Sequence, residues 1–362
     1  MNVSAALLSA AVLLGPCAMA QETAQVSVRE IGQFFDKAAS APLMGQDAAY
    51  SIPLGDNESL WCFGDTVIAD VVDGKEVLRA MPSSTSAIYR SSDIYSIKGN
   101  LEYIRDKDGL PAYTIPLGEY LPYYYVRKYW PQHGVKVNGK VYLYYSIIQA
   151  FGTGGMDFAQ VGQGLAVSKD NGRTFRQIKL PCGYAFWNDV QPAFGGAVYK
   201  GGDGWLYVYG RGLSGPGEYS LFLARVMGEN IERPSMYLYF SGMDGEQPVW
   251  TADILKAKPV LQRGESELSV SRNEYLGGYL MLYSALGRVE LRTAPNPWGP
   301  WNEAATVMQC RNIPGDMCYA AKEHYQYALE GGKKVFFTLI YSKAYIPQLY
   351  EAVLGEGLRL KR

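Results

Sequence analysis

The chain has 362 residues, 48% of them hydrophobic and 19% charged, which is enough to bury a sizeable core in one large domain or two ordinary ones. Its formal net charge is −1 and it has no long basic or acidic run, which argues against charge-driven binding to nucleic acid or to an anionic membrane. The 29 tyrosines and 40 glycines, set in short β-like runs, are typical of an all-β protein whose exposed aromatic faces suit sugar rings.

Residues 1–20 are predicted to be a secretory signal peptide. Residues 5–14 form a short apolar core, and small residues at positions 18 and 20 fit cleavage after Ala20. The start of the chain lacks the usual basic residue, since the first one is Arg29. The apolar stretch is far shorter than a bilayer span, which disfavours a membrane anchor. The sequence therefore predicts a secreted or periplasmic protein without a membrane span.

Residues 21–41 are predicted to form an N-terminal helical segment, because apolar residues within 26–40 recur at helical spacing. These residues are Val26, Ile31, Phe34 and Phe35. After Pro42 the pattern changes to short strands and turns. No low-complexity linker follows, so we expect residues 42–362 to form one domain.

Five later stretches share one shape, a turn with Gly, Asn or Asp followed by an apolar, alternating strand rich in aromatic residues. The stretches are 56–65, 138–146, 203–210, 277–284 and 331–339. Their irregular spacing, roughly 55 to 80 residues, suits four-stranded blades with variable loops. The sequence therefore predicts an all-β, five-bladed β-propeller. A β-sandwich is the alternative, but its turn signals should recur evenly, without this longer period.

Two local patterns bear on structure rather than chemistry. Residues 168–175 (SKDNGRTF) match the Asp box, a hairpin motif common in propellers, and we expect its Asp170 to bond its own loop.

Export would leave four cysteines, Cys62, Cys182, Cys310 and Cys318, which allow three possible pairings. Cys310 and Cys318 bracket a loop with Gly and Pro and are the expected bridge; four free thiols are the alternative. No cysteine or histidine spacing indicates zinc, although a structural metal ion in an axial channel stays open.

The first of the five units holds two aspartates that a hairpin would bring together. Residues 45–66 read as two strands joined by a turn at 55–58. Reversal there pairs positions whose numbers sum to about 113, so Asp47 and Asp65 meet at the same open end with Cβ atoms about 5 to 8 Å apart. Pro53 cannot donate a ladder hydrogen bond, which leaves a slip of one residue open.

Two carboxylates this close push their pKa values apart, so that one can act as an acid and the other as a base. Glycoside hydrolysis needs such a pair, separated by about 5–5.5 Å for retention and about 6.5–9.5 Å for inversion of configuration. Asp65 lies beside Trp61 and Phe63 and is the better candidate for a raised pKa. In the alternative interpretation, Asp65 caps its own turn and Asp47 sits in a surface loop.

This stretch resembles a family of secreted bacterial propellers, long known only as a domain of unknown function, that share a G-x-D … W-x-FGDT opening. Some members have been linked to endo-D-arabinanase activity. The matching residues are Gly45, Asp47, Pro53, Leu54, Gly55, Trp61, Phe63, Gly64, Asp65 and Thr66, with further likeness in 129–145, 296–301 and 318–324. The resemblance implies a relative of the five-bladed furanosidases and arabinanases whose acidic pair is Asp47 and Asp65. Gln46 departs from the pattern, since Thr is common there.

Residues at the starts of other units are candidates for binding substrate, because strand starts point toward the axis in this fold class. Glu265 or Glu267, ahead of the fourth unit, is a possible third carboxylate; solvated loop charges are the alternative. Ahead of the third unit, Asp189 with Trp187 and Asn188 offers an aromatic face and an amide for a sugar, unless Trp187 packs between blades.

Trp130 and His133 open the second unit and His324 opens the fifth, where polar side chains would line an axial pocket. A lone histidine is more often a hydrogen-bonded structural residue, which is the preferred interpretation of each.

The hypothesis that unites these features is a glycoside hydrolase that cleaves a furanoside polysaccharide, with arabinan the expected substrate and an inverting course favoured. The protein is expected to be a monomer without a cofactor. One rival is a non-catalytic carbohydrate-binding propeller. Another is a sialidase-like hydrolase, which the Asp box suggests but which needs an Arg triad and a Tyr nucleophile.

Overall fold

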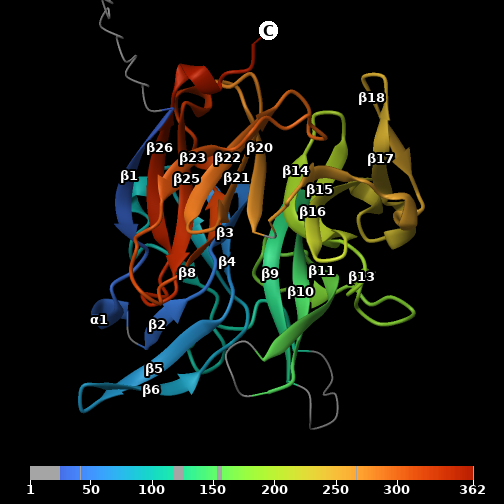
Figure 1. Cartoon of the computed structure of the whole chain (residues 1–362). Helices are drawn as coiled ribbons and strands as arrows, with labels where there is room; N and C mark the ends of the chain where they lie inside the picture. Colours follow the sequence, from blue (N-terminus) through green and yellow to red (C-terminus); the bar gives the residue numbers. More distant parts are fainter. Residues whose placement is uncertain (1–24, 41, 118–125, 153–156, 266, 362) are drawn as a thin grey trace, which may run out of the picture.

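The computed structural model describes residues 25–40, 42–117, 126–152, 157–265 and 267–361 (Figure 1). The predicted signal peptide, residues 1–20, lies outside the described residues. Within the described part of the chain, no helix is long and apolar enough to cross a membrane.

The described chain is all-β and consists of antiparallel sheets with almost no helix, as the sequence predicts. Its one α-helix is the four-residue α1 (Lys37–Ser40). The 3-10 helices are η1 (Ile94–Ser96), η2 (Gly228–Asn230), η3 (Pro234–Met236), η4 (Ile254–Lys256), η5 (Tyr325–Tyr327), η6 (Glu330–Gly332) and η7 (Glu356–Leu358).

Five sheets of the described chain have at least four strands, and each is named here by one edge strand. The β3 sheet has the order β3 (Tyr50–Gly55), β4 (Glu58–Phe63), β7 (Thr85–Arg90), β8 (Glu102–Tyr103). The β9 sheet has β9 (Val126–Val137), β10 (Lys140–Ala150), β11 (Phe158–Ser168) and β12 (Arg176–Gln177), with β13 (Trp187–Asn188) also on β11. The β14 sheet has β14 (Ala193–Lys200), β15 (Trp205–Gly215), β16 (Glu218–Met227), β17 (Leu238–Asp244) and β18 (Gln247–Thr251), with β19 (Pro259–Gln262) on β16.

The other two large sheets follow the same plan. The β20 sheet has β20 (Leu268–Asn273), β21 (Gly278–Ala285), β22 (Arg288–Ala294) and β23 (Ala305–Gln309). The β24 sheet has β24 (Cys318–Glu323), β25 (Lys334–Tyr341), β26 (Gln348–Leu354) and β1 (Val26–Gln33). A small sheet has β2 (Leu43–Gln46), β5 (Thr66–Val72) and β6 (Lys75–Ala80).

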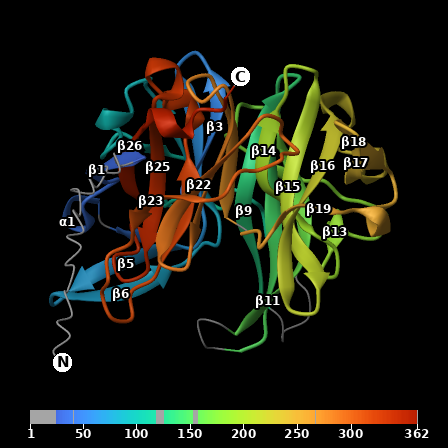
Figure 2. The same cartoon turned by 45° about the horizontal axis from the view of Figure 1, so that its top comes forward.

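Successive edge strands of the large sheets contact one another in chain order, around a line called the axis here. Figure 2 shows β3, β9 and β14 side by side. β3 contacts β9, β9 contacts β14, β14 contacts β20 and β20 contacts β24. The circle closes between the β24 and β3 sheets, where His324 Nδ1 and Ser51 Oγ are 2.8 Å apart. The arrangement is propeller-like, and it brings the first residues of the edge strands together at one face.

The five repeated strands predicted from the sequence are β4, β10, β15, β21 and β25, and each is the second strand of its sheet. On β4, Trp61 and Phe63 belong to one apolar cluster, while Leu60 and Cys62 belong to another on the opposite face. Burial of both faces between neighbouring sheets explains why these strands read as continuous apolar runs.

The predicted N-terminal helix is wrong, because residues 26–33 form strand β1. β1 pairs antiparallel with β26, the last strand of the chain, and thereby completes the β24 sheet. Val26 and Val28 pack against the apolar cluster of that sheet, and Arg29 pairs with Glu351 of β26 at 3.0 Å. Pairing with a distant strand overrides the helical spacing. The folded unit therefore begins before the predicted boundary at residue 42.

Two local predictions are confirmed. The backbone N–H and hydroxyl of Thr174 donate to Asp170 at 2.9 and 2.6 Å, so the Asp-box carboxylate bonds its own loop. Cys310 and Cys318 form the expected disulfide, while Cys62 is a buried and Cys182 an exposed free thiol.

The small β2-β5-β6 sheet interrupts the β3 sheet in sequence, because β5 and β6 lie between β4 and β7. The β5–β6 hairpin extends away from the large sheets (Figure 1) and exposes Val71, Val77 and Leu78. The chain therefore leaves the β3 sheet immediately after β4, at the position of Asp65.

Candidate active site

Asp47 and Asp65 lie directly opposite each other on adjacent chain segments. The N–H of Asp47 donates to the carbonyl of Asp65 at 3.0 Å, and the N–H of Gly64 donates to the carbonyl of Asp47 at 2.9 Å. The predicted juxtaposition is confirmed, and the pairing shows the slip of one residue that Pro53 left open. The turn itself pairs Gly55 with Glu58 as expected, and a register shift between Pro53 and Gly55 then displaces the rest of the ladder.

The glycines of the motif make room for this geometry. A Cβ on Gly64 would lie 3.3 Å from Cβ of Asp47, and a Cβ on Gly45 would lie 2.9 Å from the ring of Tyr345. Ala48 follows Asp47 with φ +62°, a left-handed conformation that separates β2 from β3. The motif thus encodes close packing around Asp47.

Asp65 is held by the β9 sheet. Lys128 Nζ lies 2.9 Å from Oδ2 of Asp65, and Trp130 Nε1 donates to Oδ1 at 3.2 Å. Asp65 is 7% exposed, so this charge-assisted pair is largely shielded from water. Trp130, a predicted substrate-binding residue, therefore contacts one of the two predicted catalytic carboxylates.

Asp47 is held from the opposite side, by the β24 sheet. Its carboxylate hydrogen-bonds the hydroxyls of Tyr319 and Tyr345, and the N–H of Ala48 donates to it at 2.7 Å. Burial, followed by the negative charge of Glu267, raises the pKa of Asp47 to about 7. The raised pKa of Asp47 was not expected from the sequence; it arises chiefly from burial and then from the charge of Glu267.

Glu267 is the third carboxylate of the cluster. Tyr50 Oη donates to Glu267 at 3.2 Å and the N–H of Ala320 donates at 2.9 Å. Burial raises the pKa of Glu267, while the hydrogen bond from Ala320 and the positive charge of Lys322 lower it. Of the two glutamates that the sequence offered, Glu267 is the one whose charge acts on Asp47.

Glu265 lies beside the cluster and lines a polar cavity of about 540 Å³. Other residues of this cavity include Arg211, Tyr219 and Gln262. The Arg211 guanidinium stacks 3.7 Å from the centre of the Tyr219 ring. Burial raises the pKa of Glu265, and Arg211 opposes that shift. A flat cation, an aromatic ring, an amide and a carboxyl form a surface that suits an uncharged, hydroxyl-rich ligand.

The two histidines have structural partners. His133 Nδ1 accepts from the N–H of Val198 at 2.9 Å, and His324 contacts Ser51 and Thr338 at 2.8 and 3.0 Å. Both are buried, and burial lowers the pKa of His324 to about 3 and that of His133 well below its usual value. Both imidazoles are therefore neutral, and their partners lie on β14 for His133 and on β3 and β25 for His324.

The candidates ahead of β14 do not join the cluster. Trp187 is buried and its Nε1 donates to Tyr239 Oη at 3.1 Å, so this ring packs in the core as the alternative interpretation proposed. Asn188 and Asp189 are exposed, and the Asn188 side chain accepts from the N–H of Val190. Among the described residues, no contact joins Asn188 or Asp189 to Asp47 or Asp65.

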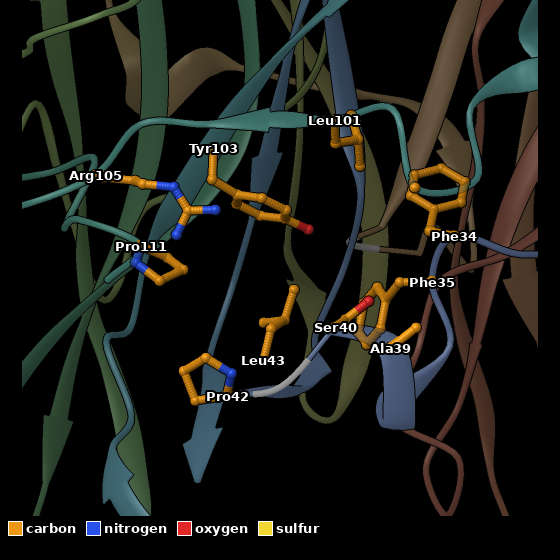
Figure 3. A pocket seen from close by; sticks show the side chains of 11 residues that line it. Phe34, Phe35, Ala39, Ser40, Pro42, Leu43, Leu101, Tyr103, Arg105 and Pro111 are labelled. Carbon is orange, nitrogen blue, oxygen red and sulfur yellow. The ribbon is translucent and has the colours of Figure 1, made fainter. Parts of the chain in front are cut away.

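A separate cavity of about 260 Å³ lies on the other side of β2. Figure 3 shows Phe35, Leu43 and Tyr103 around it. Tyr103 Oη donates to the buried side chain of Gln46 at 2.6 Å. The cavity wall therefore supports the residue next to Asp47.

Sequence reasoning missed Lys128, Tyr319, Tyr345 and Lys322. Lys128 follows Arg127 and Lys322 precedes Glu323, so neither lysine stands out as a lone charge in an apolar strand, and no local signal identifies them.

Comparison with solved structures identifies the class of fold. The structure is similar to a suspected hydrolase from Bacteroides ovatus, with a TM-score of 0.65, 14% identity, and coverage of 92% of this chain and 93% of that one. It is also similar to a family 117 glycoside hydrolase from Zobellia galactanivorans (TM-score 0.53, 13% identity, 93% and 92% coverage). A GH43_1 enzyme from Xanthomonas citri matches with a TM-score of 0.51, 14% identity, and 91% and 90% coverage. At these identities the likeness shows a shared fold.

Residues 36–351 match the family described as Domain of unknown function (DUF4185), and the chain belongs to that family. No match to the sequence is found among curated proteins.

Proposed function

We propose that this protein is an exported, monomeric, five-bladed propeller enzyme that hydrolyses a furanoside polysaccharide of the arabinan type with inversion. The observation that carries the proposal is the opposed pair of Asp47 and Asp65, each with its own set of partners. The shared fold with glycoside hydrolases of families 43 and 117 supports the reaction class. The FGDT motif supports the choice of arabinan.

The partners of the two carboxylates favour inversion. Lys128 and Trp130 draw Asp65 toward the β9 sheet, while Tyr319 and Tyr345 draw Asp47 toward the β24 sheet. The β9 sheet contacts β3 directly, and the β24 sheet reaches β3 through His324 and Ser51. Each carboxyl group is thus oriented by its own sheet, which suits an acid and a base that act on opposite faces of the sugar ring.

In this proposal Asp47 is the general acid and Asp65 the general base. Asp47 gives its proton to the glycosidic oxygen as the bond to the anomeric carbon breaks. Asp65 takes a proton from the water that attacks this carbon from the opposite face, so the product has the inverted configuration. Because the pKa of Asp47 is raised to about 7, we expect activity to fall as pH rises above about 7.

Binding of the polymer is assigned to the cavity beside Glu265. Its two arginines, Arg211 and Arg263, are balanced by Glu218 and Glu265, which suits a neutral polysaccharide. A cavity of about 540 Å³ beside the cleavage point can hold sugar units next to the scissile bond.

The test is release of reducing sugar from D-arabinan and L-arabinan. Asp47→Asn and Asp65→Asn should each lower kcat at least about 10³-fold, because each removes a proton-transfer group. The matched control is Asp56→Asn, an exposed residue in the turn at the other end of the same hairpin, which should keep wild-type activity. Proton NMR of the first product formed should show the inverted anomer.

Two results would replace the proposal. If Asp47→Asn and Asp65→Asn both retain full activity on a polysaccharide that the wild type cleaves, neither aspartate takes part in the reaction. A wild-type protein that cleaves nothing but is retarded in arabinan affinity gels would be a carbohydrate-binding propeller.

A further inference from the structure

A buried lysine occupies the axis of the molecule. Lys322 on β24 is 1% exposed, and its Nζ donates to the carbonyls of Gln132 on β9 and Gly196 on β14 at 3.2 and 2.8 Å. Nζ also lies 3.7 Å from the centre of the ring of Tyr50, which is the first residue of β3. Burial lowers the pKa of Lys322 to about 7, and the negative charge of Glu267, directly before β20, opposes this shift. The Lys322 ammonium group on β24 thus contacts β3, β9 and β14, and the charge of Glu267 reaches it from the residue before β20.

The carbonyls that accept from Lys322 lie at breaks in the strand ladders. The β9–β10 ladder shifts register at Gln132 and the β14–β15 ladder shifts at Gly196. The β24–β25 ladder shifts between Tyr319 and Lys322. A β-bulge leaves one residue out of the ladder and re-aims its groups. Three edge strands therefore interrupt their pairing near the ammonium, and two of them turn carbonyls toward it, as at a cation site.

The other titratable groups around this ammonium are neutral. They are Tyr50 on β3, Cys62 on β4, His133 on β9 and His324 after β24. Burial raises the pKa of Cys62 to about 12 and lowers the pKa of both histidines. β14 contributes a carbonyl only. Among the described residues, Glu267 is therefore the anion that compensates Lys322.

Glu267 connects the axis to the candidate active site. Its charge acts on Lys322 on one side and on Asp47 on the other. The groups that face it are Asp47, Tyr50, Glu265, Tyr319, Ala320 and Lys322. Within the described chain, no group of three or more His, Cys, Asp or Glu is placed to hold a metal ion.

We propose that Lys322, in its protonated form, is a positioning residue that serves as the channel cation, meaning the positive charge enclosed by the edge strands, and keeps Glu267 ionised beside Asp47. An ionised Glu267 repels the charged form of Asp47, so Asp47 retains the proton that it must donate. The expected pH dependence rests on the proposed function, in which Asp47 is the acid. The role of Lys322 as the channel cation is independent of that function.

The first experiment uses Lys322→Met, which keeps the length of the side chain and removes its charge. Glu267 then binds a proton, its repulsion of Asp47 disappears, and the alkaline limb of the kcat/KM profile should move down by about one pH unit. The midpoint of thermal unfolding should fall by about 5 °C, because the buried Glu267 loses the charge that compensates it. Lys200→Met, at an exposed position on β14, should change neither. A Lys322→Met variant with the wild-type pH profile and midpoint would overturn the proposal.

The second experiment is a double-mutant cycle with Glu267→Gln, read as the unfolding midpoint without substrate. If Lys322 and Glu267 compensate each other, the double variant should be more stable than Lys322→Met alone. If Lys322→Met does not fold, a folded double variant still supports the proposal, and an unfolded one overturns it. EDTA should leave the wild-type midpoint unchanged, and a fall of several degrees would show that a metal ion is the channel cation instead.

The two proposals can fail separately. A wild-type protein that is inactive on arabinan but shows the expected compensation in the cycle refutes the proposed function and keeps Lys322 as the channel cation. An active enzyme without compensation does the reverse.

Discussion

Asp47 is the residue at which stability and the proposed activity oppose each other. Its pKa is raised from 3.8 to about 7, chiefly by burial. Because the folded protein binds a proton that the unfolded chain has released, stability falls as pH rises between these two values. The carboxyl group therefore destabilises the fold under the alkaline conditions in which it is charged.

Asp47→Asn should remove this pH dependence along with the activity. Between pH 5 and pH 8 the wild type should lose about 2–3 kcal/mol of unfolding free energy, nearly two pKa units of linkage, that the amide variant keeps. Urea denaturation at pH 5 and pH 8 measures the difference. Asp56→Asn should follow the wild type, and parallel curves for Asp47→Asn and wild type would contradict the raised pKa.

At this scale the sequence predicts the acidic pair but not its partners. Asp47 and Asp65 belong to one hairpin, so counting from the turn finds them, and Pro53 marks the place where the register shifts. Lys128 and Tyr319 reach the pair from other sheets. No local spacing encodes such contacts, so the sequence does not predict the environment that raises the pKa of Asp47.

Strand β24 contributes three residues to the candidate site and its surroundings. Tyr319 bonds Asp47, the N–H of Ala320 bonds Glu267, and Lys322 occupies the axis. The Cys310–Cys318 disulfide closes the loop directly before this strand. The covalent link therefore fixes the point from which the strand enters the site.

Replacing both bridged cysteines by serine should cost about 2–3 kcal/mol, the chain-entropy value for so short a loop. The kcat value should fall as well, because Tyr319 and Ala320 lose their anchor. Urea denaturation and arabinan hydrolysis measure the two effects. Cys182→Ser, an exposed free thiol, is the control and should resemble the wild type. A double serine variant with wild-type kcat would show that the loop does not position the strand.

On the scale of the whole molecule, the sequence predicts the five repeated strands because each is a short, local pattern. It does not predict that the two ends of the chain pair with each other, as β1 and β26, to complete the β24 sheet. Residues 26–33 fit helical spacing, and only the presence of β26, more than three hundred residues later, selects a strand. Closure is a property of the two ends of the chain together, and no window of sequence contains both.

Proline substitutions can test this closure. In an antiparallel strand, N–H groups of successive residues point alternately toward the partner and away from it. Of Ser27→Pro and Val28→Pro, one should therefore lower the unfolding midpoint by several degrees and the other much less, so each controls for the other. Both should be mild if the segment were the first turn of a helix. Two mild substitutions would contradict the pairing of β1 with β26.

Because β1 pairs with β26, the last strand of the chain, the β24 sheet can be completed only at the end of biosynthesis. Asp47 and Asp65 leave the ribosome early, whereas Tyr319, Lys322 and Tyr345 emerge near the end. A nascent or prematurely terminated chain thus has the acidic pair without the tyrosines that hold it, and lacks the ammonium at the axis. Such long-range contacts form late and slowly. Catalytic competence would then begin only with the last strand, which makes a complete chain the condition for activity.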